Sequence, residues 1–219
     1  MNFEQARFNM VEQQIRPWDV LDQRVLDVIS STPREDFVPA EYRQLAFSDT
    51  QLPIGHNQVM MRPNMEGRML QALAIRPSDI ILEVGTGSGY ISACLAQLGK
   101  HVYTVDIHPE FTHSAEAKLS ARRIDNVTFC TGDASQVWDQ LHQYDVIAIT
   151  GSVPEIPPRH KEALLDGGRL FVIVGNPGMP VMEAVLLTRT GQNQWAHKSL
   201  FETTLPALIH ATKAPQFVF

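Results

Sequence analysis

The stretch that most constrains this chain is an apolar run followed at once by a glycine-rich loop. Residues 80–84 are Ile-Ile-Leu-Glu-Val, and glycine then recurs at every second position, at Gly85, Gly87 and Gly89. The apolar run predicts a buried strand, and the apolar residues 90–98 predict a helix. Glycine allows positive φ and has no Cβ, so the free N–H groups that begin the helix can approach a ligand closely. A tight turn without a ligand is the simpler interpretation, and the acidic residues further along the chain weigh against it.

The order of predicted elements after Ser78 indicates a parallel sheet covered on both faces. Strands and helices alternate, and the strands are nearly continuous apolar runs, as expected for strands buried on both faces. The predicted strands are 80–84, 101–105, 127–130, 145–149 and 169–174, and the predicted helices are 89–98, 109–122, 134–141 and 158–165. Residues 183–190 and 194–205 then predict an antiparallel hairpin joined by 191–193. The fold class is therefore α/β, a doubly wound Rossmann-like sheet.

The residues ahead of this sheet predict a helical layer. The expected elements are helices at 3–15, 20–30 (capped by Asp19) and 42–46, an irregular segment at 49–62, and a helix from Pro63 to about Ala74. We expect a single domain over residues 1–219. It would comprise an N-terminal helical cap region (1–77), a cofactor-binding α/β core (78–178) and a C-terminal hairpin (179–219).

Composition and charge limit the class of protein. The chain has 219 residues, a net charge of −6 and 44% hydrophobic residues, which is ordinary for one globular domain. No basic run exceeds Arg122-Arg123, no apolar stretch reaches membrane-spanning length, and the first residues lack a signal-peptide pattern. We expect a cytoplasmic protein without a nucleic-acid or membrane partner. The sequence does not define the oligomeric state and is compatible with a monomer. Cys94 and Cys130 predict buried thiols, and we expect neither a disulfide nor a metal site.

Acidic residues follow two further predicted strands, at the edge where a parallel sheet binds its ligand. Asp106 ends the second strand about 20 residues beyond the glycine loop, the spacing at which a carboxylate takes the hydroxyls of a ribose. Asp133 follows the third strand, where it can accept a hydrogen bond from an adenine amino group. Each has a simpler interpretation, Asp106 as a solvated strand end and Asp133 as a helix cap. Together with the glycine loop they favour an adenosine-containing ligand.

The spacing of the loop favours S-adenosylmethionine over a dinucleotide. The dinucleotide fingerprint G-x-G-x-x-G/A needs a small residue at its sixth position, which is Tyr90 here. Glu83, just before the loop, disfavours a pyrophosphate and suits a cation. S-adenosylmethionine carries an ammonium, a sulfonium and a ribose.

Several stretches resemble one family. Residues 82–90 are similar to the first motif of class I methyltransferases. The other stretches are Met10–Pro17, Pro33–Pro39, Leu52–His56, Tyr144–Ile147, Pro154–Pro157 and Leu165–Leu170. Between about residues 10 and 178, the chain resembles the protein-L-isoaspartate O-methyltransferase family. The motifs at Met10–Pro17 and Leu52–His56 are rather specific to it, whereas the glycine loop occurs in many methyltransferases.

The resemblance implies a seven-stranded fold, the last strand antiparallel, and methyl transfer from S-adenosylmethionine to the carboxylate of isoaspartyl residues in damaged proteins. The ester then collapses to a succinimide, which starts repair. The implied ribose partner is Asp106, and Asp133 with Ala134 would meet the adenine. The complete set of candidate cofactor-binding residues is Met61, Glu83, Gly85, Thr86, Gly87, Ser88, Gly89, Asp106, Ile107, Asp133 and Ala134.

One departure from the family concerns the methyl acceptor. After Gly-His the family usually has a Thr-Ile-Ser run, whose serine lies beside the transferred methyl; here Val59 takes the threonine position and Met61 the serine position. The catalytic residue is therefore unidentified. Val59, Met60 and Arg62 are candidate substrate residues, Arg62 because its guanidinium can bind a carboxylate bidentately. The simpler interpretations are apolar lining for the first two and a solvated side chain for Arg62. His56 is expected to be structural, since no metal ligand is spaced near it.

Three hypotheses follow. The first is a methyltransferase of the isoaspartyl-repair type. The second is a divergent methyltransferase acting on another carboxylate or a small molecule, because both family hydroxyls are missing. The third is an S-adenosylmethionine-binding protein without transferase activity. Nucleic-acid amino-methylation is disfavoured, because residues 150–153 lack the Asp/Asn-Pro-Pro-aromatic run of such enzymes.

Overall fold

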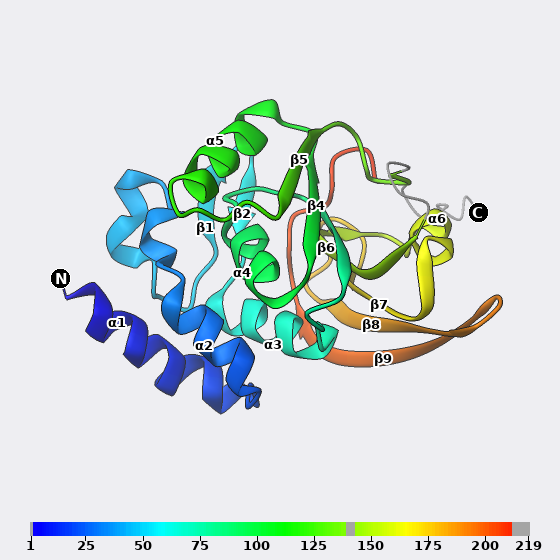
Figure 1. Ribbon diagram of the computed structural model, residues 1–219, viewed down its shortest axis with the longest axis horizontal. Helices are drawn as coiled ribbons and strands as arrows, with labels where there is room; N and C mark the ends of the chain where they lie inside the picture. Colours follow the sequence, from blue (N-terminus) through cyan, green and yellow to red (C-terminus); the bar gives the residue numbers. More distant parts are fainter. Residues whose placement is uncertain (1, 139–142, 212–219) are drawn as a thin grey trace.

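A seven-stranded mixed sheet forms the centre of the molecule (Figure 1). The computed structural model describes residues 2–138 and 143–211. The strands are β3 (Ile80–Val84), β4 (His101–Asp106), β5 (Val127–Thr131), β6 (Tyr144–Val153), β7 (Leu164–Val174), β8 (Met182–Gly191) and β9 (Gln194–Thr203). Their order is β5-β4-β3-β6-β7-β8-β9. The first five strands in this order are mutually parallel, and β8 is antiparallel to both of its neighbours. The predicted α/β fold class and C-terminal hairpin are confirmed.

Successive residues of each central strand enter two different hydrophobic clusters, because side chains alternate across a sheet. In β3, Ile81 packs into the cluster that includes the N-terminal helices, and Leu82 packs into the cluster on the opposite face. Val146 and Ile147 of β6 divide in the same way. Burial on both faces explains why these strands are continuous apolar runs in the sequence.

The helices of the core follow the prediction with two corrections. α4 (Tyr90–Leu98) and α5 (Pro109–Ser120) lie beside β4, as Figure 1 shows. The helix predicted at 134–141 is wrong over 134–138, where the chain is irregular; residues 139–141 lie outside the described residues. Here the Asp133 carboxylate accepts a hydrogen bond from the Ser135 N–H (2.9 Å), a local bond that competes with helix formation.

The helix predicted at 158–165 is also too long. α6 (Pro158–Glu162) ends early, because Leu164 already pairs with Tyr144 and so belongs to β7. Pairing with a neighbouring strand therefore outweighs the local helical preference of these residues.

The N-terminal layer holds α1 (Phe3–Met10), which continues as a π-helix (Val11–Ile15) and a 3-10 turn (Arg16–Trp18), followed by α2 (Gln23–Ser31) and α3 (Pro63–Leu73). Shorter 3-10 helices span Arg34–Asp36 and Ala40–Leu45. The predicted cap Asp19 is wrong: it adopts a left-handed conformation after the 3-10 turn, and Asp22 caps α2 through the Arg24 N–H (2.9 Å).

The predicted irregular segment at 49–62 contains a small hairpin. β1 (Leu52–Gly55) and β2 (Gln58–Met60) pair antiparallel around a two-residue turn, His56-Asn57. Both turn residues have positive φ, 51° and 58°, which is the type I′ geometry that matches the twist of a hairpin.

Two further expectations concern the cysteines and the membrane. Cys94 and Cys130 are both buried and do not form a disulfide, as predicted. Among the residues that the structure describes, none of the helices combines the length and the apolar character needed to span a bilayer.

Candidate functional site

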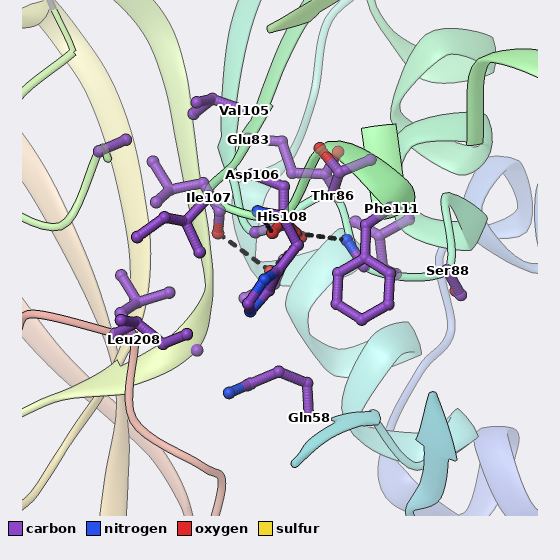
Figure 2. A pocket seen from close by; sticks show the side chains of 18 of the residues that line it. Gln58, Glu83, Thr86, Ser88, Val105, Asp106, Ile107, His108, Phe111 and Leu208 are labelled. Atoms are coloured by element: carbon purple, nitrogen blue, oxygen red, sulfur yellow. Dashed lines mark hydrogen bonds between the residues drawn. The ribbon is translucent and has the colours of Figure 1, made fainter. Parts of the chain in front are cut away.

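A pocket of about 800 Å³, open to solvent, lies at the carboxyl ends of β3, β4, β5 and β6 (Figure 2). The strand order reverses beside β3, because β4 and β5 lie on one side of it and β6 and β7 on the other. Open parallel sheets bind their ligands at such a reversal. The position of the pocket therefore agrees with the sequence prediction.

The pocket has two walls. The strand-end wall comprises Glu83–Ser88, Asp106–Ile107 and Asp133–Ala134. The hairpin wall comprises Ile54 and Gln58–Met61. All predicted cofactor-binding residues except Gly89 line the pocket.

Glu83 is a buried carboxylate with one oxygen engaged and one available. Its Oε2 accepts hydrogen bonds from Ser92 Oγ and from Thr104 Oγ1 (2.6 Å). Its Oε1 is buried and, within residues 2–138 and 143–211, has no hydrogen-bond partner. Burial raises the pKa of Glu83 to about 8, although the two hydroxyl bonds oppose the shift. An unpaired buried carboxylate oxygen is costly. Because Glu83 lies in a pocket wall, a hydrogen-bond donor of a ligand could pair with this oxygen.

The glycine loop requires glycine for two different reasons. Gly85 has a φ of +100°, and a Cβ there would collide with the Thr150 side chain of β6. Gly89, with a φ of +83°, caps α4, and a Cβ there would lie 2.7 Å from the Ala115 Cβ of α5. Gly85 thus allows the loop to lie close to β6. Gly89 allows α4 and α5 to approach each other, and it does not itself line the pocket.

The Asp106 carboxylate is fixed by two backbone N–H groups. Its Oδ2 accepts from the Gly87 N–H (2.9 Å) and its Oδ1 from the His108 N–H (3.0 Å). Each carboxylate oxygen keeps a second lone pair, so both can still accept hydroxyl donors from a ligand. Asp106 is therefore oriented in advance and joins the glycine loop to the start of α5.

Asp133 is held by the backbone two residues further on and by a side chain from the C-terminal segment. Its Oδ1 accepts from the Ser135 N–H, and its Oδ2 lies 2.9 Å from His210 Nδ1. Slight burial raises the pKa of Asp133, but these two contacts outweigh it and lower the pKa below its ordinary value. The carbonyl of the neighbouring Ala134 pairs with His160 Nε2 (2.8 Å).

The hairpin wall rests on a buried ion pair. Arg34 is fully buried and donates hydrogen bonds to Glu66, to the Met61 carbonyl (2.7 Å) and to the Ala46 carbonyl (2.7 Å). Its guanidinium also lies over the Tyr90 ring, 4.9 Å from the centroid. This one side chain therefore connects the hairpin wall to α3 and α4.

Glu66 adds a further acidic group to the pocket, beside the hairpin wall. Its Oε1 is buried, and no hydrogen-bond partner for it lies in the described part of the chain. Burial raises the pKa of Glu66 to about 7, with Arg34 opposing the shift. For Arg34, burial alone would lower the pKa, but the Glu66 carboxylate raises it on balance.

The candidate substrate residues separate in the structure. Val59, Met60 and Met61 line the pocket, and Met60 and Met61 are buried. Arg62 is exposed and does not line it. Pocket-lining residues that the sequence analysis missed include Gln58, Glu66, His108, Phe111, Ser135, Thr150, Leu208 and Ile209. Of these, only Glu66 has a feature in the sequence that indicates a site, because it is an acidic residue on the apolar face of a predicted helix.

The strand order, the reversed β8 and the glycine loop after the first core strand define the Rossmann-like methyltransferase fold. The sequence pattern of one family, protein-L-isoaspartate(D-aspartate) O-methyltransferase, matches residues 5–205. The chain belongs to this family.

Relatives with that name support the assignment. The protein-L-isoaspartate O-methyltransferase of Gloeobacter violaceus is 40% identical over 181 residues, which is 83% of this chain and 88% of the relative. That of Koribacter versatilis is 37% identical over 183 residues, or 84% and 82%. A solved structure from Plasmodium falciparum, described as a protein-L-isoaspartate O-methyltransferase with S-adenosyl-L-homocysteine, has a TM-score of 0.79 at 18% identity. It covers 95% of this chain and 98% of that one, and it shows the shared fold.

Proposed function

We propose that this protein transfers a methyl group from S-adenosylmethionine to the carboxylate of isoaspartyl residues in damaged proteins. Membership of the family carries the proposal, since the family pattern covers residues 5–205. The pocket supports it independently, because a glycine loop and three acidic groups meet at the carboxyl ends of the strands.

The residues present suit this cofactor. The unpaired Glu83 Oε1 can accept a hydrogen bond from an ammonium group, and a cation beside it would favour its ionised form. Asp106 would hold the ribose hydroxyls through its free lone pairs. Asp133 would accept from the adenine amino group, with Ala134 beside the ring. Gly85–Ser88 would lie along the remainder of the cofactor.

The acceptor needs orientation more than activation. S-adenosylmethionine supplies a methyl group on a positively charged sulfur. An acceptor carboxylate is already ionised at neutral pH, so no general base is required. As its oxygen bonds to the methyl carbon, the carbon–sulfur bond breaks and its electron pair remains on sulfur, leaving a methyl ester and a neutral thioether. Val59, Met60 and Met61 would form an apolar side of this site and exclude water from the line of attack.

The acidic net charge of −6 supports a protein partner rather than nucleic acid. The two unbridged cysteines support a location in the cytoplasm. We extend the proposal to a single catalytic domain, of which the N-terminal layer is part because Arg34 supports the hairpin wall.

The decisive experiment uses an isoaspartyl peptide with methyl-labelled S-adenosylmethionine. We expect label in a base-labile ester on this peptide and none on the matched peptide with ordinary aspartate. Calorimetry with S-adenosyl-L-homocysteine, run alongside, tests the cofactor pocket. Binding without any turnover of the isoaspartyl peptide would refute the proposed substrate, and no binding at millimolar concentration would refute the cofactor.

A further inference from the structure

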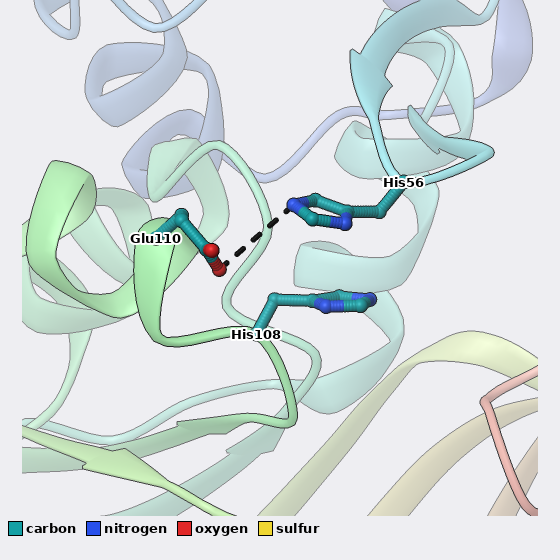
Figure 3. A group of neighbouring side chains, drawn as sticks. All are labelled: His56, His108 and Glu110. Atoms are coloured by element: carbon teal, nitrogen blue, oxygen red, sulfur yellow. Dashed lines mark ion pairs between the residues drawn. The ribbon is translucent and has the colours of Figure 1, made fainter.

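Three potential metal ligands lie close together (Figure 3), and one of them, His108, lines the pocket. His56 occupies the turn between β1 and β2, His108 immediately precedes α5, and Glu110 lies in the first turn of that helix. One ligand atom from each lies within 4.8 Å of the other two. The sequence conceals this group, because His56 is distant along the chain from the other two residues.

The two imidazoles are placed by backbone that is itself fixed. His56 has a positive φ in the type I′ turn, and the His108 N–H donates to Asp106 Oδ1 (3.0 Å). The rings stack, with centroids 3.9 Å apart and planes 18° from parallel. Phe111 contacts both rings edge-on, with centroids 5.3 Å and 5.5 Å away. The hairpin turn and the start of α5 therefore place the two rings against each other.

Two donor atoms of this group are poorly satisfied by the protein. The Nε2 of His108 is buried and has no hydrogen-bond partner among the residues that the structure describes. The Nε2 of His56 faces Glu110 Oε2 at 3.8 Å, which is too long for a hydrogen bond. A cation would satisfy the ring nitrogens and the carboxylate together.

We propose that His56, His108 and Glu110 bind a divalent transition-metal ion of the zinc type. Two imidazoles and one carboxylate suit zinc, cobalt or nickel, whereas magnesium and calcium prefer oxygen ligands alone. Zinc–nitrogen bonds of about 2.0–2.1 Å place tetrahedral ligand atoms roughly 3.3 Å apart, so the donor atoms would converge by up to about 1.5 Å. The two stacked rings would rotate so that both lone pairs point at the ion. His56 and Glu110 can move inward, since their side chains are 39% and 67% exposed. Water would complete the coordination.

Such an ion would tie together the two walls of the pocket. His108 lines the pocket and directly follows Asp106–Ile107 of the strand-end wall. His56 is the first residue of the turn that leads into Gln58–Met60 of the hairpin wall. Metal binding would hold these walls at a fixed separation and so slow the release of a bound nucleoside. The metal site itself does not depend on the proposed methyltransferase activity.

The test is calorimetric titration of tag-free, chelator-treated protein with zinc chloride. We expect one equivalent to bind with micromolar affinity. His56→Asn removes the imidazole but tolerates the positive φ of the turn, and Glu110→Gln alters an exposed side chain. Each should weaken zinc binding by at least about 10- to 100-fold, the effect that even outer-shell partners of metal sites reach. His113→Ala, an exposed histidine on α5, is the matched control and should leave the affinity unchanged.

Two further measurements keep the proposal testable if one variant misfolds. Cobalt should give a visible absorption spectrum in the wild type and in His113→Ala, and none in His56→Asn or Glu110→Gln. Zinc should slow the dissociation of S-adenosyl-L-homocysteine from the wild type but not from Glu110→Gln. The proposal is overturned if the wild type binds no zinc, or if both ligand variants bind it as tightly as the control. Thermal melts of the metal-free variants establish that they are folded.

Discussion

The two walls of the pocket are stabilised in different ways. In the strand-end wall, side chains at the ends of parallel strands accept hydrogen bonds from nearby backbone: Asp106 from Gly87 and His108, and Asp133 from Ser135. The hairpin wall instead depends on Arg34, which lies on a distant 3-10 turn. One wall is therefore built into the sheet, whereas the other depends on a single buried ion pair between remote segments.

The largest expected effect is on the ion pair behind the hairpin wall. Arg34→Met leaves Glu66 buried without its partner and two carbonyl groups without a donor. We expect the free energy of unfolding in urea to fall by about 3–5 kcal/mol. The double variant Arg34→Met/Glu66→Met should recover part of this loss, because no unpaired charge remains. A loss below about 1 kcal/mol in the single variant would show that the hairpin wall does not depend on the pair.

The next effect concerns pH and the buried carboxylate of the strand-end wall. The pKa of Glu83 is about 8 in the folded protein against an ordinary value of 4.5, so the native state binds an extra proton between these values. Its contribution to stability is full below pH 4.5 and is lost as the pH rises to 8, on the order of 3–5 kcal/mol in all. In urea denaturation at several pH values, the free energy of unfolding of Glu83→Gln should therefore rise relative to that of the wild type as the pH rises. A difference that does not vary with pH would contradict the shift.

A smaller effect is expected at Asp106. Asp106→Ala removes a charged acceptor from the strand-end wall, and binding of S-adenosyl-L-homocysteine should weaken by about 1.5–3 kcal/mol, or roughly 10- to 150-fold. Asp125→Ala, at an exposed aspartate just before β5, is the matched control. An unchanged dissociation constant in Asp106→Ala, measured by calorimetry, would refute the ribose role.

The smallest expected effect lies in the hairpin wall, at the position of the missing hydroxyl. Met61→Ser should raise turnover of the isoaspartyl peptide up to about tenfold, the value of one hydrogen bond near 1.4 kcal/mol. Met60→Ser, at the neighbouring lining residue, controls for the loss of an apolar side chain. Equal activity in the wild type and Met61→Ser would count against placing Met61 beside the acceptor.

The strand-end wall could be predicted because its information is local. Gly85, Asp106 and Asp133 each follow an apolar strand, and parallel strands bring their carboxyl ends to one edge. Strand positions and the fold class were predictable for the same reason. The prediction failed at 134–138. In the sequence Asp133 resembles a helix cap, but in the structure its side chain accepts a hydrogen bond from nearby backbone and no helix follows over 134–138.

The hairpin wall could not be predicted in the same way. His56-Asn57 lacks the Asn-Gly or Asp-Gly signal of a type I′ turn, so the sequence predicts an irregular segment there. Nothing local indicates that Arg34 contacts Met61 and Glu66, or that Leu208 returns to the pocket from beyond the last strand. These placements depend on long-range packing of the folded chain.

The buried pair of Arg34 and Glu66 also restricts how this protein can change over evolutionary time. Losing either residue first would pass through an intermediate with an unpaired buried charge, which selection against unstable proteins would tend to remove. Replacement is expected to be coupled, with both positions changing together or neither. A lineage that adapts its acceptor site near Met61 would therefore do so around a fixed Arg34 and Glu66, and its variation would collect at Val59 and Met60.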